Sequence, residues 1–203
     1  MIFRKLLRME SETVNSFLIA GLGNPGEQYR CNRHNVGYMV LDRLAARLGV
    51  KFTRLESKAL VTKADYSGKR IVLAKPRTYM NLCGQSIGAL ARYYKIPLEQ
   101  LMVVYDDVDL PQGVLRLRPG GGSAGQKGMI SIIDRLGTND FPRLRIGIGR
   151  PPGRMDAAAY VLRDFSAAEK EALNETLETA VEAVLTFVGE GLEAAMNRYN
   201  GLA

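Results

Sequence analysis

Apolar runs of the kind that form buried strands alternate along this chain with segments whose apolar residues recur at helical spacing. The strand-like runs are Phe17–Ala20, Ala59–Tyr66, Arg70–Lys75, Leu101–Tyr105, Val114–Arg118 and Arg143–Ile148. The helical pattern covers Val36–Leu48, Gly84–Tyr94, Ala124–Leu136, Ser166–Val188 and Leu192–Tyr199. Strands that alternate with helices predict an α/β fold, a single three-layer domain in which a twisted, mixed and largely parallel sheet is flanked by helices.

Local signals mark the ends of two of these helices. Gly49 follows the first helix and is a natural stop. Ser166 and Glu169 have the spacing of a capping box, which predicts the start of the long C-terminal helix. Gly189 predicts its end.

The chain of 203 residues is long enough for one domain with a sizeable core, and no repeat or long linker divides it. We therefore expect one domain over residues 17–203. The first sixteen residues carry a basic patch without the apolar segment and cleavage site of a secretory signal. Residues 1–16 are expected to be a tail, either disordered or part of an over-called start, since a start at Met9 gives a more compact chain.

The net charge of +7 is distributed unevenly along the chain. From Ser166 onward there are seven glutamates and only two basic residues, so the rest of the chain carries about +12. Basic residues recur beside a glycine-rich stretch, namely Arg116, Arg118, Arg143, Arg145, Arg150 and Arg154. A solvated charged surface would explain the net charge alone, but this clustering favours a polyanionic partner such as nucleic acid.

The numbers of cysteine and histidine residues and the lengths of the apolar runs exclude several classes of protein. Cys31 and Cys83 are too few for a disulfide framework, and a single histidine rules out a Cys/His zinc site of the usual spacing. No apolar run approaches the roughly 20 residues that span a bilayer. We expect a cytoplasmic protein without a metal, cofactor or membrane association.

His34 is the only histidine, and it follows a tight loop that leaves the first predicted strand. Imidazole is the side chain whose ordinary pKa suits proton transfer near neutral pH, so His34 is the candidate general base. The loop also contains Gly21, Gly23 and Gly26 in the spacing of a dinucleotide-binding fingerprint. That fingerprint requires a helix from its second glycine and an acidic residue about 20 positions further on. Both are missing here, so a nucleotide cofactor is not expected.

Two amides and two adjacent carboxylates could act with His34. Asn24 lies in an Asn-Pro-Gly sequence that is good turn chemistry in itself, and Asn81 could be only an N-cap or turn residue. Asp106 and Asp107 end an apolar strand, where carboxylates often cap the chain or face solvent. Together with His34, these residues supply a base, a carboxylate to orient it and amides to bind a polar substrate. The set favours hydrolysis without a Ser or Cys nucleophile.

Four ordered segments of the chain resemble the bacterial peptidyl-tRNA hydrolase family, from about Phe17 to the C-terminus. They are LIAGLGNPGEQYRCNRHNVGY, KPRTYMNLCG, VVYDDVDLPQGVLRLRPGGGSAGQKG and FPRLRIGIGRPPG. The resemblance implies a monomeric α/β enzyme that cleaves the ester between a peptide and the terminal ribose of tRNA, and so recycles the tRNA. Peptidyl-tRNA is then the expected partner.

The resemblance also implies roles for individual residues. His34 would be the general base for water, and Asp106 would hold its other ring nitrogen. The implied substrate-binding residues are Asn24, Tyr29, Tyr79, Asn81, Gln126 and Lys127. Gly120–Gly128 would shape the channel for the tRNA 3′ end, and Arg118 and Arg145 would grip its 5′ phosphate, although alternation on solvent-facing strand positions also explains the two arginines.

The chain departs from the family pattern in three places. Gln126 and Lys127 replace a common His-Asn pair, and Arg150 replaces a frequent histidine. Lys127 cannot accept a hydrogen bond, so any role of the usual Asn in binding water or the carbonyl is lost or passes to another group. The departure keeps open an alternative function, a catalytically weak RNA-binding protein on the same scaffold.

Overall fold

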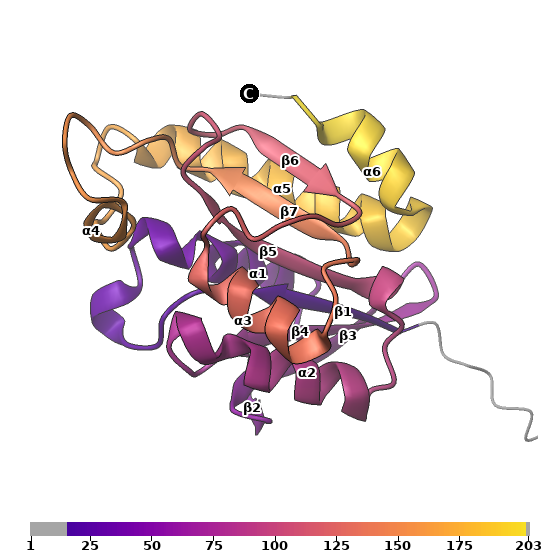
Figure 1. The fold of residues 1–203 in the computed structure, drawn as a ribbon. Helices are drawn as coiled ribbons and strands as arrows, with labels where there is room; N and C mark the ends of the chain where they lie inside the picture. The colour runs from indigo at the N-terminus through magenta and orange to yellow at the C-terminus, as the bar shows by residue number, and fades with distance from the viewer. Residues whose placement is uncertain (1–15, 202–203) are drawn as a thin grey trace, which may run out of the picture.

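The computed structural model describes residues 16–201, which form a seven-stranded sheet between two layers of helices (Figure 1). The strands are β1 (Ser16–Gly21), β2 (Arg54–Glu56), β3 (Ala59–Tyr66), β4 (Lys69–Pro76), β5 (Leu101–Asp107), β6 (Leu115–Arg118) and β7 (Arg143–Gly147). Their order across the sheet is β2-β3-β4-β1-β5-β7-β6. The expected three-layer α/β fold with a mixed sheet is confirmed.

Six α-helices and four short 3₁₀ helices connect these strands within residues 16–201. The α-helices are α1 (Val36–Arg47), α2 (Cys83–Tyr93), α3 (Lys127–Leu136), α4 (Ala157–Val161), α5 (Lys170–Glu190) and α6 (Leu192–Tyr199). The 3₁₀ helices are η1 (Glu27–Tyr29), η2 (Arg33–Asn35), η3 (Met80–Leu82) and η4 (Leu98–Gln100). Each helix within residues 16–201 is too short or too polar to cross a membrane.

The central strands β4, β1, β5 and β7 run parallel, and antiparallel strands complete both edges. Both faces of β1 are buried, as expected for a parallel strand that is apolar at successive positions. Phe17 and Ile19 pack with α1, α5 and α6, whereas Leu18 and Ala20 pack with α2 and α3. Since parallel strands end at one edge of a sheet, the loops after β1 and β5 are brought together there.

Two elements carry too little periodic signal to be expected from the sequence. β2 has three residues, is charged, and pairs with β3 through a register that places Leu55 opposite Leu60. α4 has five residues and follows its N-cap Asp156, whose carboxylate accepts a hydrogen bond from the Ala159 N–H at 3.0 Å. Both are shorter than the windows from which hydrophobic periodicity is read.

The predicted limits of the long C-terminal helix α5 were wrong at both ends. Its capping box does form, because the Ser166 N–H donates to Glu169 Oε2 at 2.6 Å and the Glu169 N–H donates to Ser166 Oγ at 3.4 Å. These hydrogen bonds close a turn, and regular α-helix begins only at Lys170. Gly189 lies inside the helix, which ends at Glu190. The C-cap residue Gly191 has φ +102°, a conformation that favours glycine.

α3 begins three residues later than predicted. Ala124 and Gly125 have positive φ values of 49° and 78° and therefore stay outside the helix. Gln126 is its N-cap. Of the expected tail, residues 1–15 lie outside the described residues, and Ser16 is the first residue of β1, paired with Arg70.

Candidate active site

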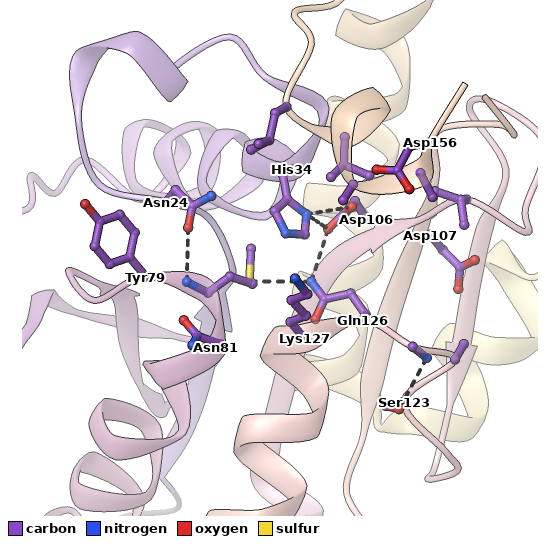
Figure 2. A pocket seen from close by; sticks show the side chains of 18 residues that line it. Asn24, His34, Tyr79, Asn81, Asp106, Asp107, Ser123, Gln126, Lys127 and Asp156 are labelled. Carbon is purple, nitrogen blue, oxygen red and sulfur yellow. Dashed lines mark hydrogen bonds and ion pairs between the residues drawn. The ribbon is translucent and has the colours of Figure 1, made fainter. Parts of the chain in front are cut away.

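A cavity of about 680 Å³ opens beyond the ends of β1 and β5, between the loop after β1, η3, the start of α3 and α4 (Figure 2). It collects most of the residues expected in the site, namely Asn24, His34, Tyr79, Asn81, Asp106, Gln126 and Lys127. Tyr29 lies on η1 and does not line this cavity. Residues 16–201 contain no group of three His, Cys, Asp or Glu side chains placed to hold a metal ion.

His34 and Asp106 are paired at the floor of this cavity. His34 Nδ1 lies 2.9 Å from Asp106 Oδ1 and 2.8 Å from Oδ2, and the aspartate side chain is almost fully buried. A carboxylate only accepts hydrogen bonds, so Nδ1 carries the ring proton and Nε2 of the neutral ring holds a lone pair. Within residues 16–201, Nε2 makes no hydrogen bond. The ring is therefore oriented to take a proton through Nε2.

Arg33 fixes the segment that carries His34. Its buried guanidinium donates to both carboxylate oxygens of Glu169, at 2.7 and 2.8 Å, and lies over the rings of Tyr160 and Phe165. Burial alone would raise the pKa of Glu169, but hydrogen bonds from Ser166 and Arg33 outweigh it and lower that pKa. Sequence patterns carry no signal for this contact, because its partners are separated by more than 130 positions.

Asn24 is held by Asn35 at the end of η2. The Asn24 N–H donates to Asn35 Oδ1 at 2.9 Å, and Asn35 Nδ2 donates to the Asn24 carbonyl at 3.0 Å. The Asn24 side-chain oxygen accepts from the Met80 N–H at 3.0 Å. The side-chain NH₂ of Asn24 makes no hydrogen bond within residues 16–201 and remains available as a donor. Asn35 was missed in the sequence because a polar residue before an apolar helix is typical of an ordinary cap.

Tyr79 and Asn81 flank the buried Met80 on the opposite wall. Both are exposed, and Tyr79 retains 63% of its accessible surface. Asn81 lies inside η3, whereas Leu82 is the N-cap residue of α2. The structural alternative of an N-cap role for Asn81 was therefore wrong.

The Gln126 amide contacts protein groups on both sides. Its oxygen accepts from the Met129 N–H at 2.8 Å, and its nitrogen lies 3.2 Å from Asp106 Oδ1 and 3.5 Å from Met80 Sδ. Lys127 follows it and is exposed to the cavity. Within the described part of the chain, the Lys127 ammonium makes no hydrogen bond or ion pair.

A second cavity, of about 340 Å³, brings Arg118 and Arg145 together beside the glycine-rich loop. In the β6–β7 register Arg116 is opposite Arg145 and Arg118 is opposite Arg143, so all four arginines share one face of the sheet. Arg143 is buried and donates to three loop carbonyls, those of Gly121, Gly122 and Asn139.

Asp107 is buried and forms an ion pair with Arg145. Burial alone would lower the pKa of Arg145, but the hydrogen bond and charge of Asp107 raise it above its usual value. Asp107 also accepts a hydrogen bond from the Asp109 N–H at 2.8 Å, so it caps the turn that follows β5. Neither Asp106 nor Asp107 faces solvent.

Comparison with known proteins identifies the family. The family model described as peptidyl-tRNA hydrolase matches residues 18–203. The chain belongs to this family. Relatives include the peptidyl-tRNA hydrolase of Chloroflexus aggregans, 51% identical over 92% of this chain and all of the relative. The chloroplastic peptidyl-tRNA hydrolase of Arabidopsis thaliana is 52% identical over 91% of this chain and 64% of the relative.

A solved structure of the family shares the fold as well as the sequence. The crystal structure of peptidyl-tRNA hydrolase from Acinetobacter baumannii superposes with a TM-score of 0.86 at 32% identity, over 93% of this chain and 96% of that one. Gln126, Lys127 and Arg150 are the positions at which the sequence is expected to depart from the family pattern. Arg150 donates to Asp109 at 3.0 Å in an exposed ion pair.

Proposed function

We propose that this protein hydrolyses the ester between the peptide and the tRNA in peptidyl-tRNA, with His34 as the general base for water. Family membership makes the chain a peptidyl-tRNA hydrolase. The observation that carries the mechanism is the His34–Asp106 pair inside a cavity that Asn24 also lines. The role of each residue follows from what its side chain can donate or accept.

His34 would activate a water molecule. Its Nε2 takes a proton from the water as the oxygen attacks the ester carbonyl, and the imidazolium that forms is stabilised by Asp106. When the tetrahedral intermediate collapses, Nε2 returns the proton to the ribose oxygen of the leaving tRNA. The products are a free peptide carboxylic acid and tRNA with an intact terminal hydroxyl. No covalent enzyme intermediate is required.

The amides and Lys127 would bind the ester and the peptide. The NH₂ of Asn24 is directed by the hydrogen bond of its oxygen to Met80, so its donor has a defined position. Asn81 lies on the opposite wall. The Lys127 ammonium can stabilise negative charge on the carbonyl oxygen, which the Asn common in this family would do as a neutral donor. The exposed ring of Tyr79 offers a surface for peptide side chains.

The arginine face would bind the tRNA backbone. Arg118 and Arg145 line one cavity beside the glycine-rich loop, and Arg143 supports that loop through its carbonyls. Guanidinium groups suit phosphate because they donate two parallel hydrogen bonds. Asp107 orients Arg145 and thereby fixes the direction of its remaining donors.

A direct test is release of tRNA from N-acetyl-aminoacyl-tRNA by the wild type and by His34→Ala. We expect the variant to lose about 10²–10⁴-fold in kcat while it still folds and binds tRNA. Turnover near the wild-type rate would contradict the assignment of His34. The alternative of a catalytically weak RNA-binding protein predicts tRNA binding without turnover in both proteins. The comparisons lend that alternative no support, since the relatives named above are hydrolases.

The monomeric state is expected from the family resemblance and the cytoplasmic location from the low cysteine content of the sequence, and both stay predictions. Sedimentation at micromolar concentration distinguishes a monomer of 22.4 kDa from a dimer.

A further inference from the structure

The orientation of the Gln126 amide is determined from two directions. Gln126 is the N-cap of α3, so its oxygen accepts the Met129 N–H at the start of that helix. Its NH₂ must then face the other way, where Asp106 Oδ1 accepts at 3.2 Å. The reverse assignment would place the NH₂ against an N–H and the oxygen against a carboxylate, and both contacts would be repulsive.

Asp106 consequently receives hydrogen bonds from two side chains. Its Oδ1 is shared between His34 Nδ1 at 2.9 Å and Gln126 Nε2 at 3.2 Å (Figure 2). Met80 Sδ, a weak acceptor, takes the other donor of the amide at 3.5 Å. With its donors and its oxygen engaged, the amide has little left to offer a substrate.

We infer that Gln126 is a positioning residue for the reaction, which holds the Asp106 carboxylate against His34 and connects it to the rigid start of α3. The inference rests on the proposed role of His34 and Asp106. It assigns Gln126 to the support of the base, in place of the substrate-binding role expected from its place in the loop. The carboxylate of Asp106 is buried, so a second donor restricts its rotation and keeps both oxygens on the imidazole side.

Two substitutions separate this role from the capping role of Gln126. In Gln126→Ser the hydroxyl can still cap α3, because serine is a preferred N-cap, but it is too short to reach Asp106. We expect kcat to fall about tenfold or more, as for loss of a hydrogen bond to a charged group, with KM changed less than about twofold. Gln85→Ser makes the same exchange at an exposed position of α2 and should leave kcat unchanged.

Gln126→Glu retains an oxygen for the Met129 N–H but replaces the donor with a second carboxylate beside Asp106. The titratable side chains that line this cavity are those of His34, Tyr79, Asp106, Asp107, Lys127 and Asp156. We expect a larger loss of kcat at about pH 8 than at about pH 5.5, because the introduced carboxyl group can donate to Asp106 when protonated and repels it when ionised. A purely structural role of Gln126 predicts the same loss of kcat at both pH values.

His34 gives a reporter that needs no substrate. As the only histidine, it alone contributes imidazole ¹⁵N resonances in protein freed of any polyhistidine tag. We expect Gln126→Ser to shift these resonances and Gln85→Ser to leave them in place. Suppose that the wild type is active. Unchanged imidazole resonances in Gln126→Ser, or a raised KM with unchanged kcat, would then overturn the inference and leave the proposed function standing. A wild type that binds tRNA without hydrolysis overturns the proposed function and the inference with it.

Discussion

Arg33, the residue directly before His34, donates to both carboxylate oxygens of Glu169 at the start of the long C-terminal helix. The pair is largely buried, with 8% and 20% of the two side chains exposed. It joins the segment that carries the candidate base to the segment that follows α4, and α4 itself lines the cavity. The stability of this contact is therefore relevant to the geometry of the site.

Glu169→Gln should destabilise the protein by about 1–3 kcal/mol at pH 7, because the buried guanidinium of Arg33 loses a charged acceptor. The pKa of Glu169 lies below its usual value of 4.5 in the folded protein, so its contribution is fully present above that pH. The contribution is lost as pH falls through the lowered folded pKa.

Urea unfolding of the wild type and Glu169→Gln at several pH values measures this contribution. The difference in unfolding free energy should be largest near pH 7 and shrink below about pH 4.5. The exposed pair of Glu27 and Arg30 supplies the control, since Glu27→Gln should change little at any pH. A difference that stays constant down to about pH 3 would contradict the expectation.

The two thiols should react at very different rates. Cys31 is exposed, whereas Cys83 is buried at the start of α2, and burial raises the pKa of the Cys83 thiol to about 12. Because the thiolate is the nucleophile, Cys83 should resist alkylation at about pH 8. Mass spectrometry after brief treatment with iodoacetamide should find one label, on Cys31. Equal labelling of Cys83 in the folded protein would show that this part of the core opens readily.

Asn35→Asp tests whether Asn35 positions Asn24. An aspartate can still accept from the Asn24 N–H, but it cannot donate to the Asn24 carbonyl, which it instead repels. We expect peptidyl-tRNA hydrolysis to fall by about tenfold and stability to fall by about 2 kcal/mol. Asn174→Asp makes the same substitution on the exposed side of α5 and serves as the control. Activity of Asn35→Asp equal to that of this control would exclude the positioning role.

Sequence patterns predicted the sheet and the long helices because those elements bury continuous apolar faces. Gly189 shows that a glycine in the sequence is not enough to predict the end of a helix, because glycine can also occupy an interior helical position. α5 ends before Gly191, whose backbone conformation is not helical. In the site, the contact between His34 and Asp106 was expected through the family resemblance. The contacts of Arg33 and Asn35 were not, because each depends on a distant partner or on a side-chain direction that spacing does not encode.

The two arginines of the proposed phosphate site should differ when each is replaced by alanine. Arg118 is exposed and forms no ion pair within the described residues, so Arg118→Ala should raise KM and reduce the salt dependence of tRNA binding by about one phosphate contact. Arg145→Ala also leaves the buried Asp107 carboxylate without its partner, so it should lower stability as well. Fluorescence titrations with tRNA at several salt concentrations, beside thermal melts, separate the two effects. Equal melting temperatures for both variants would show that the Asp107–Arg145 pair contributes little to the fold, and unchanged salt slopes would reject the phosphate site.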